Sequence, residues 1–396
     1  MASTSSRPRA GSGERVGIVG LGHTVFGRRT DATVQELAFE AFAAALADAG
    51  LARDAIEASV IAAVPEYHTQ RSIAGAVNDY LGLTPRPTLL VEAACASGSA
   101  AMRQAWLAIQ AGVHEVVAVI GCQKMTELPT EQILSLMGRA GDVQWESSFG
   151  TTFPGYYALF AHRHMHEHGT KREHMLDVAV KNHHYGALNP LAMFRKEITR
   201  EKAAASEVVA SPLQVFDCCA NADGAVCVIL AAGSRARGLR QAPVWIAGMG
   251  TASDSISVLR RPSLTGLPSA ERAAAEAYAM AGVGPRDIQV AEVHDCFTIA
   301  EIMAYEDLGF CARGEGGPFI AERRSYVGGT VAVNVDGGLK AKGHPIAATG
   351  VSMTYEIARQ LRGECGERQV PGAGLGLTHN VGGIGQYTYV QVLARE

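Results

Sequence analysis

Several features that mark other classes of protein are missing from this chain of 396 residues. No apolar segment approaches the roughly 18 residues of a membrane-spanning helix, so we expect no membrane partner. No run of lysines and arginines indicates a nucleic-acid-binding surface, and the formal net charge is −4. No two cysteines have the C-x-x-C spacing of a zinc ribbon. The composition, with 47% apolar and 19% charged residues, is typical of a protein with a compact core.

The amino terminus lacks the apolar core of a signal peptide. Residues 1–14 are rich in Ser, Arg and Gly, and we expect them to form a disordered tail. Without a secretory signal, the eight cysteines indicate a reducing compartment rather than a disulfide framework. We therefore expect a cytoplasmic protein.

A strand-to-helix joint at Cys95 is the centre of the predicted organisation. The apolar run 89–91 is interpreted as a buried strand, and helix-spaced apolar residues follow until Gly112. At the joint, the Cys95 thiol would face the unpaired N–H groups and the positive end of the helix dipole. Both favour a thiolate, so a lowered pKa is expected and Cys95 is a candidate nucleophile. On this stretch alone, an inert buried cysteine is an equal alternative.

The first half begins with a strand and a glycine turn at 15–22. This is not a dinucleotide-binding fingerprint, because position 25 is Val where a third glycine would stand. Thr33 and Glu36 form a capping box that predicts the start of a helix. Further strands are predicted at 60–64 and 115–120.

A long segment from about 121 to 211 interrupts the pattern and predicts a lid over the site. Its four alternating histidines, 162 to 168, would spread over different faces of a helix, so we expect no bound metal. Apolar and aromatic side chains of this segment are expected to shape the substrate pocket; they are Phe153, Tyr156, Tyr157, Phe160, Met193 and Phe194.

The second half repeats the first. Val244-x-Ile246-x-Gly248-x-Gly250 echoes Val16-x-Ile18-x-Gly20-x-Gly22, and a strand at 290–293 matches the one at 60–64. A last strand is predicted at 374–377. Such units predict two βαβαβ halves, 15–240 and 241–396, with a site between them at the carboxyl ends of the strands.

Duplication places three segments of the second half near Cys95. They are 293–297 at a strand end, a Gly-rich loop at 337–350, and 378–385 after the last strand. Each is weak evidence alone, because a loop histidine is usually an ordinary polar residue and glycine runs are usually turns. Together they supply a nucleophile, a base, a second thiol and closely approaching N–H groups, which is what covalent acyl transfer needs.

Four motifs occur together over nearly the whole chain from about Arg15. They are Ala94-Cys95-Ala-Ser-Gly98, His294-Asp295-Cys296-Phe297, Gly343-His344-Pro345 and His379-Asn380-Val381-Gly382-Gly383. This combination resembles the thiolase superfamily, and within it the sterol-carrier-protein-type thiolases and the related bacterial and archaeal acetyl-CoA acetyltransferases. The resemblance implies a five-layer α-β-α-β-α sandwich of two similar halves with an inserted lid. It also implies a homodimer and coenzyme A thioesters as substrates, with no tightly bound cofactor.

The resemblance also implies roles for individual residues. Cys95 would accept the acyl group, and His344 would deprotonate it. Cys296 would be the second acid/base, working as a thiolate that neighbouring donors favour. His294 and His344 would form one oxyanion hole, and the N–H groups of Cys95 and Gly382 the other.

One departure from the family pattern concerns the second cysteine. Many thiolases carry their second cysteine in the last loop, where this chain has Asn380. Cys296 compensates, as in the sterol-carrier type.

Three alternatives remain beside a thiolase-type acyltransferase that cleaves 3-oxoacyl-CoA or condenses acyl-CoAs. One is a thiolase-fold retro-aldolase, whose relatives use an OB-fold, zinc-ribbon partner and do not need the cysteine nucleophile. Another is a non-catalytic acyl-CoA-binding subunit. The third, condensation on a carrier protein, is disfavoured because His294-Asp295-Cys296 is not the pattern of ketoacyl synthases.

Overall fold

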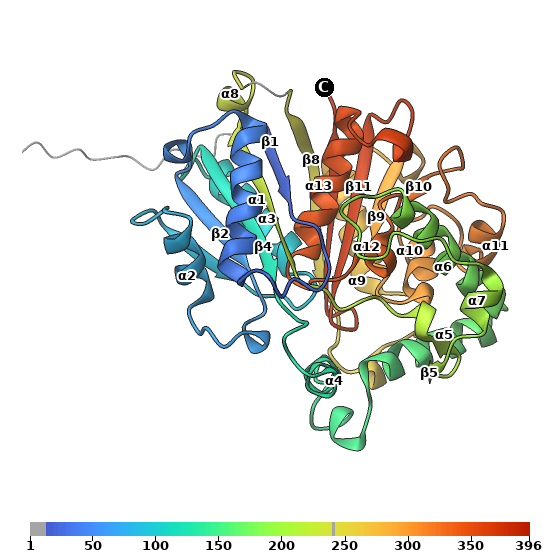
Figure 1. The fold of residues 1–396 in the computed structure, drawn as a ribbon. Helices are drawn as coiled ribbons and strands as arrows, with labels where there is room; N and C mark the ends of the chain where they lie inside the picture. Colours follow the sequence, from blue (N-terminus) through green and yellow to red (C-terminus); the bar gives the residue numbers. More distant parts are fainter. Residues whose placement is uncertain (1–12, 240–241) are drawn as a thin grey trace, which may run out of the picture.

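The computed structural model describes residues 13–239 and 242–396 (Figure 1). Ten of their strands form one sheet in the order β10-β9-β11-β12-β8-β1-β7-β4-β2-β3. These strands are β1 (Val16–His23), β2 (Ala58–Ala62), β3 (Thr88–Val91), β4 (Val116–Gln123), β7 (Gly224–Ala232), β8 (Val244–Ser253), β9 (Val290–Val293), β10 (Ala332–Val333), β11 (Leu375–Gly382) and β12 (Tyr387–Ala394).

Helices cover both halves of this sheet. They are α1 (Val34–Ala49), α2 (Ile73–Tyr80), α3 (Ser97–Gln110), α4 (Thr130–Gly138), α5 (Phe153–His168), α6 (Arg172–Ala187), α7 (Arg200–Ala204), α8 (Gly233–Ala236), α9 (Pro268–Ala281), α10 (Thr298–Asp307), α11 (Gly316–Ala321), α12 (Gly338–Lys342) and α13 (Thr349–Arg362). No described helix is long and apolar enough to cross a membrane.

The strand order confirms the predicted duplication. From the centre outward, one half reads β1-β7-β4-β2-β3 and the other β8-β12-β11-β9-β10, with the same parallel and antiparallel pairings. A short pairing of β1 with β8 joins the halves.

Repeated glycines explain why the duplication is visible in the sequence. A Cβ atom on Gly22 would lie 1.9 Å from the carbonyl oxygen of Ala41, and one on Gly250 would lie 1.9 Å from that of Ala273. Only glycine therefore lets α1 approach β1, and α9 approach β8, this closely.

The elements stack in five layers, as predicted. Helix α1 packs on one half-sheet, and α9 packs on the other. Helices α3 and α13 touch each other between the two half-sheets, where both pack on strands. This central helical layer holds the helix openings of the duplicated halves together, and therefore positions the site.

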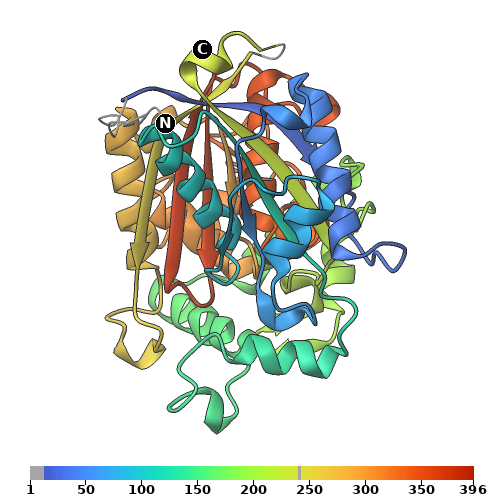
Figure 2. The same cartoon turned by 90° about the vertical axis from the view of Figure 1, so that its left-hand side faces the viewer.

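The lid is the segment 124–223 between β4 and β7. It contains α4 to α7 and a small sheet of β5 (Val208–Ala210) and β6 (Leu213–Gln214). Both views place α4 and α5 across the lower ends of the strands (Figures 1 and 2). Helix α6 packs against α10, α11 and α12 of the second half.

Two predictions about strands were wrong. The run 89–91, expected to be a buried strand, belongs to the edge strand β3, where Leu89 is 50% exposed. The strand expected at 374–377 continues to Gly382, so His379 and Asn380 lie in β11 and not in a loop. It is also not the last strand, because β12 follows it.

The predicted boundary at 240/241 lies outside the described residues, as do residues 1–12 of the predicted tail. The two domain ranges stay predictions.

Candidate active site

Cys95 lies in a tight turn between β3 and α3. Ala94 has a φ of 51°, in the left-handed region that non-glycine residues seldom adopt. The hydroxyl of Ser97 ties the turn down, because it donates to the carbonyl of Ala94 at 2.6 Å and accepts from the N–H of Ala93 at 2.9 Å. The turn thus fixes the direction of the Cys95 side chain.

The two duplicated helix openings meet beside this turn. A Cβ on Gly98 of α3 would lie 2.7 Å from the N of Val351, and one on Gly350 of α13 would lie 2.3 Å from the N of Ser99. The helices cross this closely because both positions are glycine. The crossing brings Cys95, before α3, next to His344, before α13.

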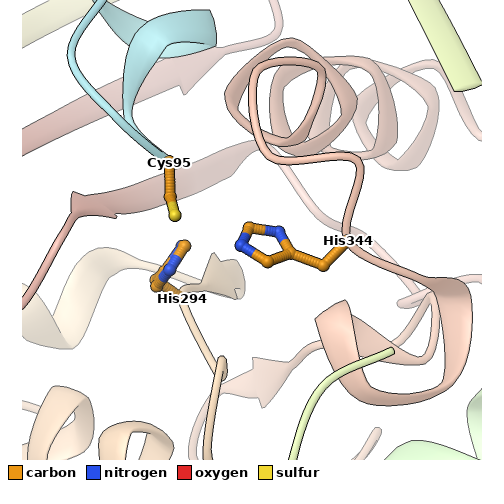
Figure 3. Close-up of side chains that lie close together, drawn as sticks. All are labelled: Cys95, His294 and His344. Atoms are coloured by element: carbon orange, nitrogen blue, oxygen red, sulfur yellow. The ribbon is translucent and has the colours of Figure 1, made fainter. Parts of the chain in front are cut away.

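The structure brings together Cys95, His294 and His344, as the sequence predicts (Figure 3). The sulfur and one nitrogen of each ring all lie within 4.8 Å of one another. All three side chains are buried, and the two rings meet edge to face with centroids 5.2 Å apart. A cavity of about 290 Å³ is lined by Cys95 together with Tyr67 and Phe153.

His344 is arranged as a base. The hydroxyl of Thr349 donates to the carbonyl of Pro345 at 3.1 Å, so it accepts from Nδ1–H of His344 at 2.7 Å. The lone pair of His344 is therefore on Nε2, which has no hydrogen-bond partner among the described residues. Burial, helped by the charge of Lys342, lowers the pKa of His344 to about 3, so the ring is neutral.

His294 is also neutral. Burial, and then the neighbouring His344 and His379, hold its pKa well below the ordinary value. Its Nδ1 lies 3.2 Å from Nδ2 of Asn380. Its Nε2 is buried without a hydrogen-bond partner in the described chain.

The prediction of a lowered pKa for Cys95 was wrong. Burial raises the pKa of the thiol to about 12, although the N–H of Gly383 and its own N–H oppose that rise. Loss of water around the sulfur thus outweighs the helix end. Cys95 is therefore a neutral thiol at rest, and it could act as a nucleophile only after proton transfer to a base.

Cys296 lies just beyond this trio and is fully buried. Burial raises its pKa well above the ordinary value, whereas a hydrogen bond with the Tyr157 hydroxyl lowers it. The expected thiolate is therefore not the resting form. The Tyr157 hydroxyl also lies 3.3 Å from the carbonyl oxygen of Gly383, which is a second acceptor for its one hydrogen, and its ring stacks on Phe297 with centroids 4.5 Å apart.

Asp295 anchors the segment that carries His294 and Cys296. Its carboxylate accepts the N–H of Leu339 in α12 at 2.7 Å and the amide of Asn182 in lid helix α6 at 2.7 Å. The lid and the second half therefore hold this segment jointly.

Gly382 lies beside the Cys95 turn, as predicted. A Cβ on it would be 2.3 Å from the carbonyl oxygen of Ala93. The N–H that reaches the Cys95 sulfur, however, is that of the next residue, Gly383.

The lid residues expected to shape the pocket separate into three groups. Phe153 lines the cavity at Cys95. Tyr156, Tyr157 and Phe160 are buried in the core of the second half. Met193 and Phe194 line another cavity, of about 620 Å³, beside Lys340.

Sequence reasoning missed Thr349 and Asn182, and gave Tyr157 and Asn380 no role in the chemistry. No spacing rule links Tyr157 to Cys296, because the lid brings them together across 139 positions. Thr349 could have been found, since position i+5 from a loop histidine at a helix start is within reach of its ring.

Comparison with known proteins identifies the family. Residues 16–234 match the family "Thiolase, N-terminal domain", and residues 250–395 match "Thiolase C-terminal domain-like". The chain belongs to the thiolase family. It is 40% identical over 384 residues to the acetyl-CoA acetyltransferase of Methanothermobacter thermautotrophicus, covering 96% of this chain and 99% of that one.

The chain is also similar to a second curated protein and to a solved structure. Human sterol carrier protein 2 is 34% identical, over 93% of this chain and 70% of that protein. The solved structure of the Ltp2–ChsH2(DUF35) aldolase has a TM-score of 0.84 and 28% identity, covering 96% of this chain and 98% of the other. The acetyl-CoA acetyltransferase relatives, which match nearly the full chain, support an acyltransferase.

Proposed function

We propose that this chain cleaves a 3-oxoacyl-CoA with free CoA, or condenses two acyl-CoAs in reverse, through an acyl group on Cys95. The observation that carries the proposal is the meeting of the Cys95 thiol with two neutral imidazoles inside 4.8 Å. Because Cys95 is not a thiolate at rest, it needs a base, and the free Nε2 lone pair of His344 can accept its proton.

In the first half-reaction, Nε2 of His344 takes the Cys95 proton and the sulfur attacks the 3-oxo carbon. The bond between C2 and C3 then breaks, which leaves the acyl group on Cys95 and the electron pair on acetyl-CoA as an enolate. His294 and protonated His344 stabilise the enolate oxygen, and the Cys296 thiol gives its proton to C2.

In the second half-reaction, the Cys296 thiolate takes the proton of incoming CoA. The CoA sulfur attacks the acyl-Cys95 thioester, and the N–H groups of Cys95 and Gly382 hold the oxyanion. When the tetrahedral intermediate collapses, the bond between the acyl carbon and the Cys95 sulfur breaks. The sulfur then regains its proton from His344. Every proton is thus handed back. The substrates are a CoA thioester and free CoA, the products are two CoA thioesters, and no tightly bound cofactor is needed.

A retro-aldolase is the second candidate, favoured by the similarity to the Ltp2–ChsH2(DUF35) aldolase. That reaction needs a base for a substrate hydroxyl and no acyl-enzyme. The converging Cys95, Cys296 and two histidines favour the thiolase. A separate OB-fold, zinc-ribbon partner that delivers substrate is compatible with either reaction.

A homodimer in the cytoplasm is part of the proposal. Among the described strands, β3 pairs only with β2 and leaves its other edge open, with Leu89 half-exposed. An open edge of this kind favours pairing with another strand. The eight free cysteines are compatible with a reducing compartment.

The experiment that tests the acyl-enzyme is intact mass after incubation with acetyl-CoA. We expect one acetyl group, on the peptide that contains Cys95, with release of free CoA. The Cys95→Ala variant should take up none. The matched control Cys122→Ala removes a buried thiol of β4 that lies in the sheet and should still be labelled. Labelling that persists in Cys95→Ala would refute the assignment.

A further inference from the structure

Asn380 is fully buried in β11, and its side-chain amide faces two atoms of the site. Its Nδ2 lies 3.1 Å from the backbone carbonyl oxygen of Cys95 and 3.2 Å from Nδ1 of His294. No other hydrogen-bonding group of the described chain contacts Nδ1 of His294.

The orientation of this amide follows from chemistry. A carbonyl oxygen can only accept, so the Asn380 atom that faces Cys95 must be the NH₂ group. The reverse orientation would set two oxygens against each other at 3.1 Å. An NH₂ group has two hydrogens, and here one goes to Cys95 and the other to His294.

The amide in turn decides the tautomer of His294. Because the Asn380 NH₂ donates, Nδ1 of His294 must accept, and the proton of this neutral ring is on Nε2. That N–H is buried, has no partner in the described residues, and belongs to the trio with Cys95 and His344. His344 has the other tautomer, because its Nδ1–H donates to Thr349 and its Nε2 therefore carries a lone pair.

We propose that Asn380 is the positioning residue that makes His294 a hydrogen-bond donor toward the reacting atoms, and that it thereby keeps the site an oxyanion hole instead of a metal site. One thiol and two imidazoles are the donor set of a zinc site. Zinc would need lone pairs on both rings. Moving the His294 proton to Nδ1 would set an N–H against the Asn380 NH₂.

The consequence for catalysis rests on the proposed thiolase function, but the tautomer and the metal preference do not. In that function the Nε2–H of His294 stabilises the enolate oxygen. At the position where many thiolases carry a thiol, this chain carries an amide that works through a histidine, and Cys296 supplies the thiol.

Histidine tautomers can be read directly by NMR. In protein labelled with ¹⁵N-histidine, we expect the His294 signals, identified by their loss in His294→Asn, to have the pattern of an Nε2–H ring. An Nδ1–H ring in the wild type would overturn the proposal whether or not the protein is a thiolase.

Two variants test the metal preference with Zn²⁺ alone as the probe. In Asn380→Asp, a carboxylate turned away from the Cys95 carbonyl would accept Nδ1–H and leave the Nε2 lone pair facing Cys95, as carboxylates do behind zinc-bound histidines. We expect Asn380→Asp to bind Zn²⁺ at least about tenfold more tightly than the wild type. Asn380→Leu, of similar size, removes the opposing NH₂ but offers Nδ1–H no acceptor, so it should gain clearly less Zn²⁺ affinity than Asn380→Asp.

The outcomes separate the two proposals. Zn²⁺ affinity is measured by calorimetry, and circular dichroism checks that both variants are folded. Equal Zn²⁺ affinities of the two variants would refute the role of Asn380. Both variants should also lose about 10²–10³-fold in the cleavage of acetoacetyl-CoA, as expected for loss of one oxyanion donor. If the wild type has no thiolase activity but His294 has the Nε2–H pattern and Asn380→Asp gains zinc affinity, only the proposed function fails.

Discussion

Burial decides the charge of every group in the site. It raises the pKa of Cys95 to about 12 and lowers that of His344 to about 3, so the pair meets as thiol and imidazole. A charged pair would pay the cost of desolvating two ions in the absence of substrate. In the proposed mechanism, the neutral pair becomes charged only when a thioester is present to disperse the charge.

Tyr157 provides a test at this scale. Tyr157→Phe removes the hydroxyl that bonds to Cys296, so the pKa of Cys296 should rise further. A rise by one unit cuts the thiolate fraction about tenfold at a given pH below that pKa. We therefore expect exchange of the acetyl α-protons of acetyl-CoA with D₂O to slow about tenfold, and its pH profile to move to higher pH.

The matched control is Tyr156→Phe, the neighbour on α5 whose hydroxyl faces Glu146 and Ser147. It should keep the wild-type exchange profile. Acetylation of Cys95 should be nearly unchanged in both variants. An unshifted profile in Tyr157→Phe would remove the hydroxyl from the chemistry of Cys296.

Sequence motifs predicted which side chains of the site lie together better than which neighbours set their protonation. Cys95, His294, Cys296 and His344 stand in recognisable patterns, and the trio that includes three of them converges as expected. The lowered pKa of Cys95 was predicted from a local rule, the helix end. Burial is a property of the assembled protein, so the local rule failed.

Secondary-structure elements follow the sequence where the pattern is repeated. The glycines of β1 and β8 predicted corresponding strands because each pair meets a helix backbone in the same way. Strand β3 was misjudged since its apolar run does not reveal that one edge is unpaired. Strand β11 was predicted too short because polar His379 and Asn380 interrupt the apolar run, although both lie in the buried end of the strand.

The open edge of β3 carries the prediction of a dimer. Light scattering should give the mass of two chains for the wild type. Leu89→Lys on β3 should shift the equilibrium toward the monomer, because it puts a charge into the proposed interface. Leu134→Lys, on the exposed face of α4, is the matched control and should stay dimeric. A wild type that is a concentration-independent monomer would contradict this interface.

At the scale of the whole molecule, the site exists only where the two halves and the lid meet. Cys95 comes from the first half, His294, Cys296, His344 and Asn380 from the second, and Tyr157 from the lid. Duplication allowed the first five to be placed near one another from the sequence. The contact of the lid with Cys296 depends on how α5 packs, which no repeat specifies.

The thiolase assignment is tested most directly by comparing two reactions in the wild type and Cys95→Ala. One is cleavage of acetoacetyl-CoA and longer 3-oxoacyl-CoAs, with and without free CoA. The other is release of an aldehyde or ketone from 3-hydroxyacyl-CoAs. We predict that the wild type cleaves 3-oxoacyl-CoA only with free CoA, and that Cys95→Ala loses this activity by at least about three orders of magnitude. Release of the carbonyl product without free CoA, equally fast in Cys95→Ala, would contradict the thiolase mechanism and establish the aldolase.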